Sequence, residues 1–269
     1  MGSVTRAGLI GALGMAAGLI AACDPVDPAE PGASASARAS SADAVVGPAD
    51  DEALVDLLGS FAPSIDGYVA LTGTRSRPSP VAAYVVDAPD VVEPSSCTAF
   101  HLASTLLTDA DLGAAARDLE FAVGWFFPGG VMPDEPPFVP SIEVYTRVFA
   151  DPELAAGVPD ALIGSGCDAY LRTATWDDGS NTLEHEVANV GWVSLEGLSS
   201  PTVRIAWAGG TATNYDAQGE LVLAETREAW DQYVHVDGVN AISIETAGLE
   251  DEAMVADLIA QFLDHMAGG

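Results

Sequence analysis

Residues 220–246 read ELVLAETREAWDQYVHVDGVNAISIET, and this stretch decides the fold class. β-Branched and aromatic residues dominate the runs Glu220–Val236 and Val239–Thr246, a composition typical of β-strands. Asp237-Gly238 separates the two runs and is typical of a two-residue hairpin turn, because glycine accepts the positive φ that such a turn requires. The stretch therefore predicts neighbouring antiparallel strands.

More β-like runs lie upstream, separated by turns that contain Gly, Asp or Asn. The expected strands are Tyr68–Thr72, Ala82–Val86, Asp118–Phe127, Ile142–Phe149, Ala169–Trp176, Thr182–Leu195 and Thr202–Ala208. The expected turns are Asp177–Gly179, Glu196-Gly197 and Asn214–Gly219, and Pro128–Pro140 is expected to form a Pro- and Gly-rich loop.

Helical patterns open and close the same region. Residues 50–61 carry leucines at helical spacing behind three acids that favour a helix N-terminus. Two more helices are expected at residues 94–107 and from Asp151, each with proline in its first turn. The apolar face of the last helix consists of Met254, Leu258, Ile259, Phe262 and Met266. Residues 50–269 are thus predicted to form a single α+β domain, an antiparallel sheet packed against a few helices.

The N-terminus carries an uncharged run of sixteen residues, Ala7 to Ala22, preceded by Arg6 and followed by Cys23. A membrane-spanning helix needs about 20 apolar residues, so the run is short for an anchor and has the layout of a signal peptide. Ile20-Ala21-Ala22-Cys23 resembles the bacterial lipobox, which implies cleavage before Cys23 and a lipid on its thiol. The alternatives are an uncleaved anchor helix or a buried helix.

Residues 1–22 are therefore expected to be a lipoprotein signal peptide, and residues 23–49 a tether. The tether is rich in Pro, Ala, Ser and acids and has too few large apolar residues to form a core. Two or more acyl chains, such as palmitate, hold a protein on a membrane well. We expect a lipid-anchored protein on the extracytoplasmic face of the cell membrane.

The formal net charge is −31, and all nine basic residues are arginine. Nucleic acids and anionic headgroups are bound through Lys and Arg, so this charge argues against nucleic acid as a partner. Arginine without lysine, together with abundant Ala, Gly and Val, resembles the composition of actinobacterial proteins.

Apart from Cys23, two cysteines remain, Cys97 and Cys167. An even pair in an exported protein favours a disulfide bond. The alternative is two buried free thiols. A catalytic thiol is disfavoured because neither cysteine lies next to a histidine in a nucleophile pattern.

The order of these elements resembles one known family. The segments are PSSCTAFHLAS, then IEVYTRVFADPELAAGVPDALIGSGCDAYL with the second cysteine, then AWDQYVHVDG, VNAISIET and a closing helix. Together they resemble the actinobacterial PknH-like extracellular sensor domain, which also occurs alone in lipoproteins. The resemblance implies a sensor or ligand-binding α+β module without established catalytic residues. That family often has two disulfides, whereas this chain has cysteines for one.

No motif in the sequence indicates catalysis, a cofactor or a metal site. In Glu184-His185-Glu186, strand alternation would place the histidine on the face opposite the two acids. There is no HExxH, CxxC, GxSxG, GxGxxG or Walker A pattern.

Aromatic residues and arginines within the expected strands are the candidates for ligand binding. Most such aromatic side chains belong to a core, but some can form the wall of a pocket. Converging arginines would recognise a carboxylate or a phosphate. The candidates are Trp125, Arg147, Arg172, Trp192, Arg204 and Trp207. The sequence favours a non-catalytic domain that binds an unknown small molecule or envelope protein; the alternative is a carrier of an apolar lipid or glycolipid.

Overall fold

The strands of the domain pair side by side in one antiparallel sheet. A computed structural model describes residues 51–71, 79–80, 91–108, 119–131, 140–176 and 179–268. The expected signal peptide, lipidated Cys23, the tether and the expected strand Ala82–Val86 lie outside the described residues. The sheet and its helices confirm the α+β fold class.

The elements have the following bounds. The strands are β1 (Tyr68–Ala70), β2 (Ser79–Pro80), β3 (Val91–Glu93), β4 (Leu119–Pro128), β5 (Ser141–Val148), β6 (Ala169–Trp176), β7 (Gly179–Val193), β8 (Thr202–Asp216), β9 (Leu221–Arg227), β10 (Trp230–Asp237) and β11 (Asn240–Ala247). The helices are α1 (Asp51–Ser60), the 3-10 turn η1 (Ser95–Cys97), α3 (Thr98–Ser104), α4 (Pro152–Gly164) and α5 (Glu252–Gly268). The strands lie in the sheet in the order β1-β4-β5-β11-β10-β8-β7-β6-β3, with β2 paired to β4 and β9 to β8.

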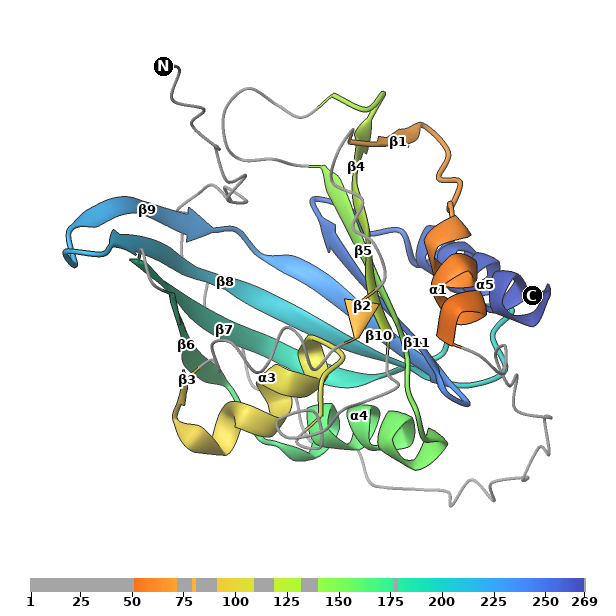
Figure 1. The fold of residues 1–269 in the computed structure, drawn as a ribbon, viewed down its shortest axis with the longest axis horizontal. Helices are drawn as coiled ribbons and strands as arrows, with labels where there is room; N and C mark the ends of the chain where they lie inside the picture. Colours follow the sequence, from red (N-terminus) through yellow and green to blue (C-terminus); the bar gives the residue numbers. More distant parts are fainter. Residues whose placement is uncertain are drawn as a thin grey trace, which may run out of the picture.

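Two pairs of helices cover opposite faces of the curved sheet (Figure 1). On one face, α1 and α5 lie side by side and pack Leu58 and Phe262 against Ile244 of β11. On the other face, α3 and α4 pack Phe100 and Val158 against Trp207 of β8. We call these the α1/α5 face and the α3/α4 face. Alternation along each strand sends successive side chains to opposite faces, so both cores use the same strands.

Strand β8 corrects two expectations. It was expected to end at Ala208, before Gly209-Gly210, yet it continues to Asp216. The expected single strand Glu220–Val236 is instead two strands. β10 pairs with the part of β8 before the glycines, and β9 pairs with the part from Gly210 onward. A Cβ on Gly210 would lie 1.8 Å from the Glu184 carbonyl oxygen, so close strand contact, and not a chain reversal, requires glycine here.

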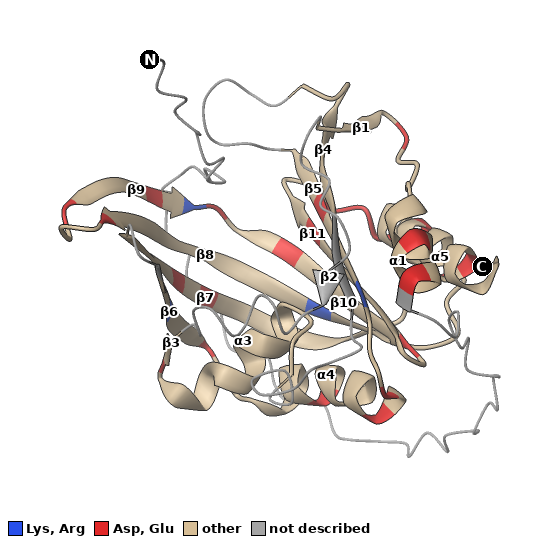
Figure 2. Cartoon of the chain, in the orientation of Figure 1, with Lys and Arg blue, Asp and Glu red and all other residues tan. Residues whose placement is uncertain are grey.

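Acidic residues are spread over α1, α4 and α5, in keeping with the net charge, and one of the arginines stands at the end of β9 (Figure 2). The start of α4 shows how acids serve the fold. Asp151 Oδ1 accepts a hydrogen bond of 2.7 Å from the Glu153 amide, and Pro152 opens the helix.

No helix in the described ranges combines the length and the apolar composition that a membrane crossing needs.

Candidate ligand-binding site

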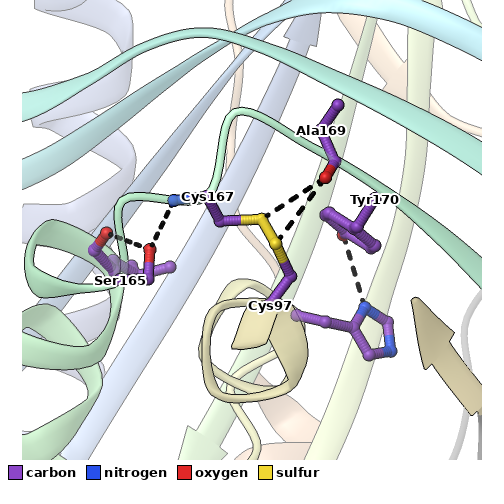
Figure 3. The surroundings of a disulfide bond; sticks show 7 residues. Cys97, Ser165, Cys167, Ala169 and Tyr170 are labelled. Atoms are coloured by element: carbon purple, nitrogen blue, oxygen red, sulfur yellow. Dashed lines mark hydrogen bonds between the residues drawn. A yellow bond between two sulfur atoms is a disulfide. The ribbon is translucent and has the colours of Figure 1, made fainter. Parts of the chain in front are cut away.

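A disulfide fixes the helices of the α3/α4 face to the sheet. Cys97 at the end of η1 is bonded to Cys167, which follows α4, with 5.4 Å between their Cα atoms (Figure 3). The two sulfurs lie 3.6 and 3.9 Å from the carbonyl oxygen of Ala169, the first residue of β6. The predicted pairing is confirmed, and α3 is held against the sheet.

A cavity of about 180 Å³ lies between the end of α3 and strands β5 and β11. Gln232 of β10 connects these walls, since its Nε2 donates to the Ser104 carbonyl at 2.6 Å and to Ser243 Oγ at 2.8 Å. Its Oε1 accepts a hydrogen bond of 3.1 Å from Trp207 Nε1. The cavity is lined by Ser104, Thr105, Leu106, Tyr145, Ser243 and Glu245.

Two carboxylates lie opposite each other on neighbouring strands next to this cavity. Glu143 of β5 and Glu245 of β11 are direct cross-strand partners and belong to the α3/α4 face. The Tyr145 hydroxyl and the Trp125 indole N–H donate hydrogen bonds to Glu143. Burial and, after it, the charge of the neighbouring Glu245 raise the pKa of Glu143 to about 7, against the effects of these donors and of Arg227. Burial also raises the pKa of Glu245, opposed by Arg227.

Arg227 and Trp230 lie near the carboxylate pair on the same face of the sheet, although neither lines the cavity. The Arg227 guanidinium carbon lies 4.5 Å from the centre of the Trp230 ring. Arg227 Nε and Trp230 Nε1 are both buried, and neither donates a hydrogen bond to a described residue. Buried N–H groups are almost always paired in folded proteins, so two neighbouring exceptions mark this part of the α3/α4 face.

Stacked aromatic rings continue the site toward β6. Trp207 and Trp230 stack with centroids 5.1 Å apart, and His185 of β7 lies 5.2 Å from the Trp207 ring. Burial lowers the pKa of His185 to about 2, and the charge of Arg227 contributes in the same direction, so the imidazole is neutral. The Tyr170 hydroxyl lies 3.3 Å from Nδ1 of His101 (Figure 3). This rigid cluster supports one side of Arg227.

The six predicted ligand-binding residues do not share one place. Trp125, Arg172 and Trp207 lie on the α3/α4 face, where Arg172 acts electrostatically on Tyr170 and His185. Buried Arg147 donates a hydrogen bond to the Leu106 carbonyl and stacks 4.0 Å over Phe149, which makes it part of the framework.

The other two predicted residues lie away from the cavity. Arg204 forms a two-pronged ion pair with Asp231, with N–O distances of 3.0 and 2.8 Å, and lies over Tyr233 toward the α1/α5 face. Trp192 near the end of β7 is 49% exposed.

Sequence reasoning missed Glu143, Tyr145 and Glu245 as members of a site, and it left Arg227 and Trp230 out of the selected candidates. A signal existed in IEVYTRVF and NAISIETA, where an acid stands between β-branched residues on a strand with no exposed face. Because the chain has forty acidic residues, these two acids did not stand out.

Comparisons with known proteins are few. No protein-family model matches the chain. No curated protein matches it either. Among solved structures, the extracellular domain of PknH from Mycobacterium tuberculosis is similar with a TM-score of 0.37 and 11% sequence identity, over 82% of this chain and 92% of that one. The resemblance expected from the order of elements is thus matched only as a distant likeness of fold.

Proposed function

We propose that this protein is a lipid-anchored, extracytoplasmic binding protein whose domain holds a small polar ligand in the cavity beneath α3. The N-terminal segment ending at Cys23 supports the anchor and the location. The disulfide supports an oxidising compartment, because such bonds persist mainly outside the cytoplasm. The proposed partners are the membrane, through the lipid, and a small molecule.

The observation that carries the binding role is the pair Glu143 and Glu245 next to a cavity. Facing carboxylates destabilise a fold unless a proton or a cation compensates them. A hydrophobic pair at these positions would stabilise the sheet better, so the pair is explained by binding and not by folding. The cavity of about 180 Å³ has polar residues such as Ser243 and Glu245 in walls that are otherwise largely apolar, and it is below the roughly 300–1,000 Å³ of pockets for drug-sized molecules.

One feature favours the alternative, a carrier of apolar cargo. A hollow of about 260 Å³ lies between α3 and α4, and most of its lining is apolar. The lining comprises Ala99, Ala103, Leu107, Thr108, Glu153, Leu154, Gly157, Val158 and Ala161. It is more open than the cavity beneath α3 and has no paired buried charges, so we rank the carrier second.

We propose no catalytic step. Two serines lie near a histidine in the described chain: Ser60 Oγ is 3.4 Å from Nε2 of His265, and Ser200 Oγ is 3.3 Å from Nε2 of His235. Nε2 of His265 is also 2.8 Å from the Leu57 carbonyl oxygen, an acceptor, so it is not a base for Ser60. The other ring nitrogen of His235 faces the Thr202 hydroxyl at 3.0 Å and not a carboxylate. His235 is fully buried, so a substrate would not reach it.

The binding role is tested by native mass spectrometry of the full chain, purified in detergent, against its denatured mass. A retained metabolite-sized mass supports the proposal, and a retained lipid favours the carrier. Thr105→Trp, at the exposed rim of the cavity, should abolish retention, while Asp56→Trp on exposed α1 should not. A bare mass in every preparation contradicts both roles. Loss of the Cys23→Ala variant from the membrane fraction tests the anchor separately.

A further inference from the structure

The polar groups that line the cavity beneath α3 are mainly hydrogen-bond acceptors. A serine or threonine hydroxyl has one proton to donate and two lone pairs that accept. The Ser104 hydroxyl donates its proton to the His101 carbonyl at 2.8 Å. The Thr105 hydroxyl donates its proton to the Leu102 carbonyl at 2.9 Å. These two hydroxyls therefore offer a ligand their lone pairs.

The other polar groups of the lining follow the same pattern. The Tyr145 hydroxyl donates to Glu143. The backbone N–H groups of Thr105 and Leu106 donate to carbonyls of α3. Strands β5 and β11 each lie between two other strands, so their backbone N–H groups are used within the sheet. Among the described lining residues, only the Ser243 hydroxyl keeps a proton for a ligand.

Glu245 is the charged acceptor of this lining, and its charge is compensated only in part. No described residue donates a hydrogen bond to its carboxylate, and Arg227 acts on it electrostatically without forming an ion pair. Its cross-strand partner, Glu143, is also an acid. One arginine acts on two carboxylates, so one negative charge is left over when both acids are ionised. A cation in the cavity would compensate this charge.

A ligand for this cavity must therefore donate hydrogen bonds and carry positive charge. We propose that the cavity binds a small primary ammonium ion, whose ammonium group binds Glu245 and has the hydroxyl oxygens of the same cavity as further acceptors. An ammonium group has three N–H donors and no acceptor, which complements this lining. Leu106 and Tyr145 contribute to the largely apolar remainder, which suits a short alkyl group. This inference rests on the proposed binding function and specifies its ligand.

Other ligand classes fit less well. An anion would be repelled by Glu245, and a neutral alcohol or sugar would leave the charge uncompensated. A metal ion needs several oxygen, nitrogen or sulfur ligands, and the described residues contain no group of three or more His, Cys, Asp or Glu side chains placed to hold one. The volume of about 180 Å³ suits an amine with a short chain and not a lipid.

The test is calorimetric titration of the full-length protein in detergent with primary alkylammonium chlorides, from methylammonium to hexylammonium. Each amine that binds is compared with two analogues of the same chain length, the alcohol and the trimethylammonium salt; for butylammonium these are 1-butanol and butyltrimethylammonium. The alcohol lacks the charge, and the trimethylammonium salt lacks the N–H donors. We expect both analogues to bind at least about tenfold more weakly. Butanoate, glucose, calcium chloride and magnesium chloride are the further probes.

A variant shows whether binding uses the proposed carboxylate. Glu245→Gln should weaken amine binding about tenfold or more but leave binding of the alcohol unchanged, so the preference for the cation is lost. Glu186→Gln, at an exposed residue of β7, should change neither affinity. Circular dichroism and thermal melting establish that each variant is folded. An equal loss of both affinities in Glu245→Gln would mean that Glu245 only shapes the cavity, which contradicts the proposal.

The remaining outcomes separate the ligand from the binding function. Equal affinity for an amine and either of its analogues overturns the ammonium ion, as does undiminished amine binding by Glu245→Gln. Binding of butanoate, glucose or a metal ion, but of no amine, overturns it and leaves a binding function. When no probe binds, the ammonium ligand is overturned; the binding function then stands if the native mass spectrum retains another metabolite and falls if the mass is bare.

Discussion

The two faces of the sheet are built from the same strands but have different chemistry. On β5, Ile142 and Val144 point into the closed apolar core under α1 and α5, whereas Glu143 and Tyr145 point to the α3/α4 face. On β11, Ile244 and Glu245 show the same division. Both faces therefore contribute stability through burial of apolar side chains, while the α3/α4 face also carries polar groups that weaken the fold unless they are compensated.

A disulfide bond stabilises the α3/α4 face, whereas the described residues of the α1/α5 face form none. The Cys97–Cys167 bond closes a loop with a sequence separation of 70 residues. In the chain-entropy view, such a loop contributes about 4 kcal/mol by restricting the unfolded chain. The double variant Cys97→Ala, Cys167→Ala should lose about this free energy of unfolding, measured by urea denaturation.

A loss below about 1 kcal/mol in that experiment would mean that α3 and α4 are held by packing alone. Intrinsic fluorescence adds a local measure, because Trp207 and Trp230 lie on the α3/α4 face. Their emission should shift toward that of exposed tryptophan at lower denaturant in the double variant.

The next largest effect concerns the point where β8 changes partners. A methyl group at Gly210 would overlap the Glu184 carbonyl oxygen at 1.8 Å, and backbone gives way poorly, so Gly210→Ala should lose about 3 kcal/mol. Gly191→Ala on β7 is the control, because its Cβ meets nothing within 4 Å. Equal melting temperatures for the two variants would contradict the close contact at Gly210.

Gly210 also shows which features of the fold could be predicted from the sequence. Helices with an apolar face, a hairpin near Asp237-Gly238 and the cysteine pair follow from local patterns and counting, and the structure confirms them. The turn of the hairpin is one residue later than expected, at Gly238-Val239, because Asp237 still pairs with Asn240. Gly209-Gly210 has the local pattern of a turn, yet glycine is required there because β7 passes close to β8. A close approach between distant segments cannot be read from the residues around one position. The strand β3 has only three residues, too few for a period-two pattern.

The site was harder to predict than the fold. Trp207 and Trp125 were selected as aromatic residues of expected strands, but the two carboxylates were not, because cross-strand register decides which acids meet. Arg204 and Arg227 both stand in strands, and alternation alone does not tell which one has a carboxylate partner. Register and pairing are set by contacts between distant segments, which a single sequence does not display.

The carboxylate pair gives the α3/α4 face a pH dependence. Because the pKa of Glu143 is raised from 4.5 to about 7 in the folded state, that state binds more protons than the unfolded chain between these values. Stability should therefore fall as the pH rises from about 4.5 to about 7 and then level off. Glu143→Gln keeps an acceptor for Tyr145 without the charge, so it should be more stable than the wild type by about 2 kcal/mol at pH 7.5.

Urea denaturation across pH 4.5 to 8 measures this effect, with Glu186→Gln at an exposed residue of β7 as the control. The variant should have a flatter profile than either the wild type or the control. A Glu143→Gln variant that follows the wild-type profile, or is less stable at pH 7.5, would show that the pair is compensated without a proton.

The smallest effect is expected for the ion pair on the opposite side of the sheet. Arg204 donates two hydrogen bonds to Asp231 and lies 3.8 Å from Glu252 of α5, but its side chain is 38% exposed. Solvent screening limits such pairs to about 0.5 kcal/mol, so Arg204→Gln should change the free energy of unfolding only by that amount and should leave ligand binding intact. The loss should decrease further in 1 M salt, because ions screen exposed charges. A loss of several kcal/mol, or a change in ligand affinity, would mean that the two faces are coupled through β8 and β10, and the separation between the α1/α5 face and the binding face would not hold.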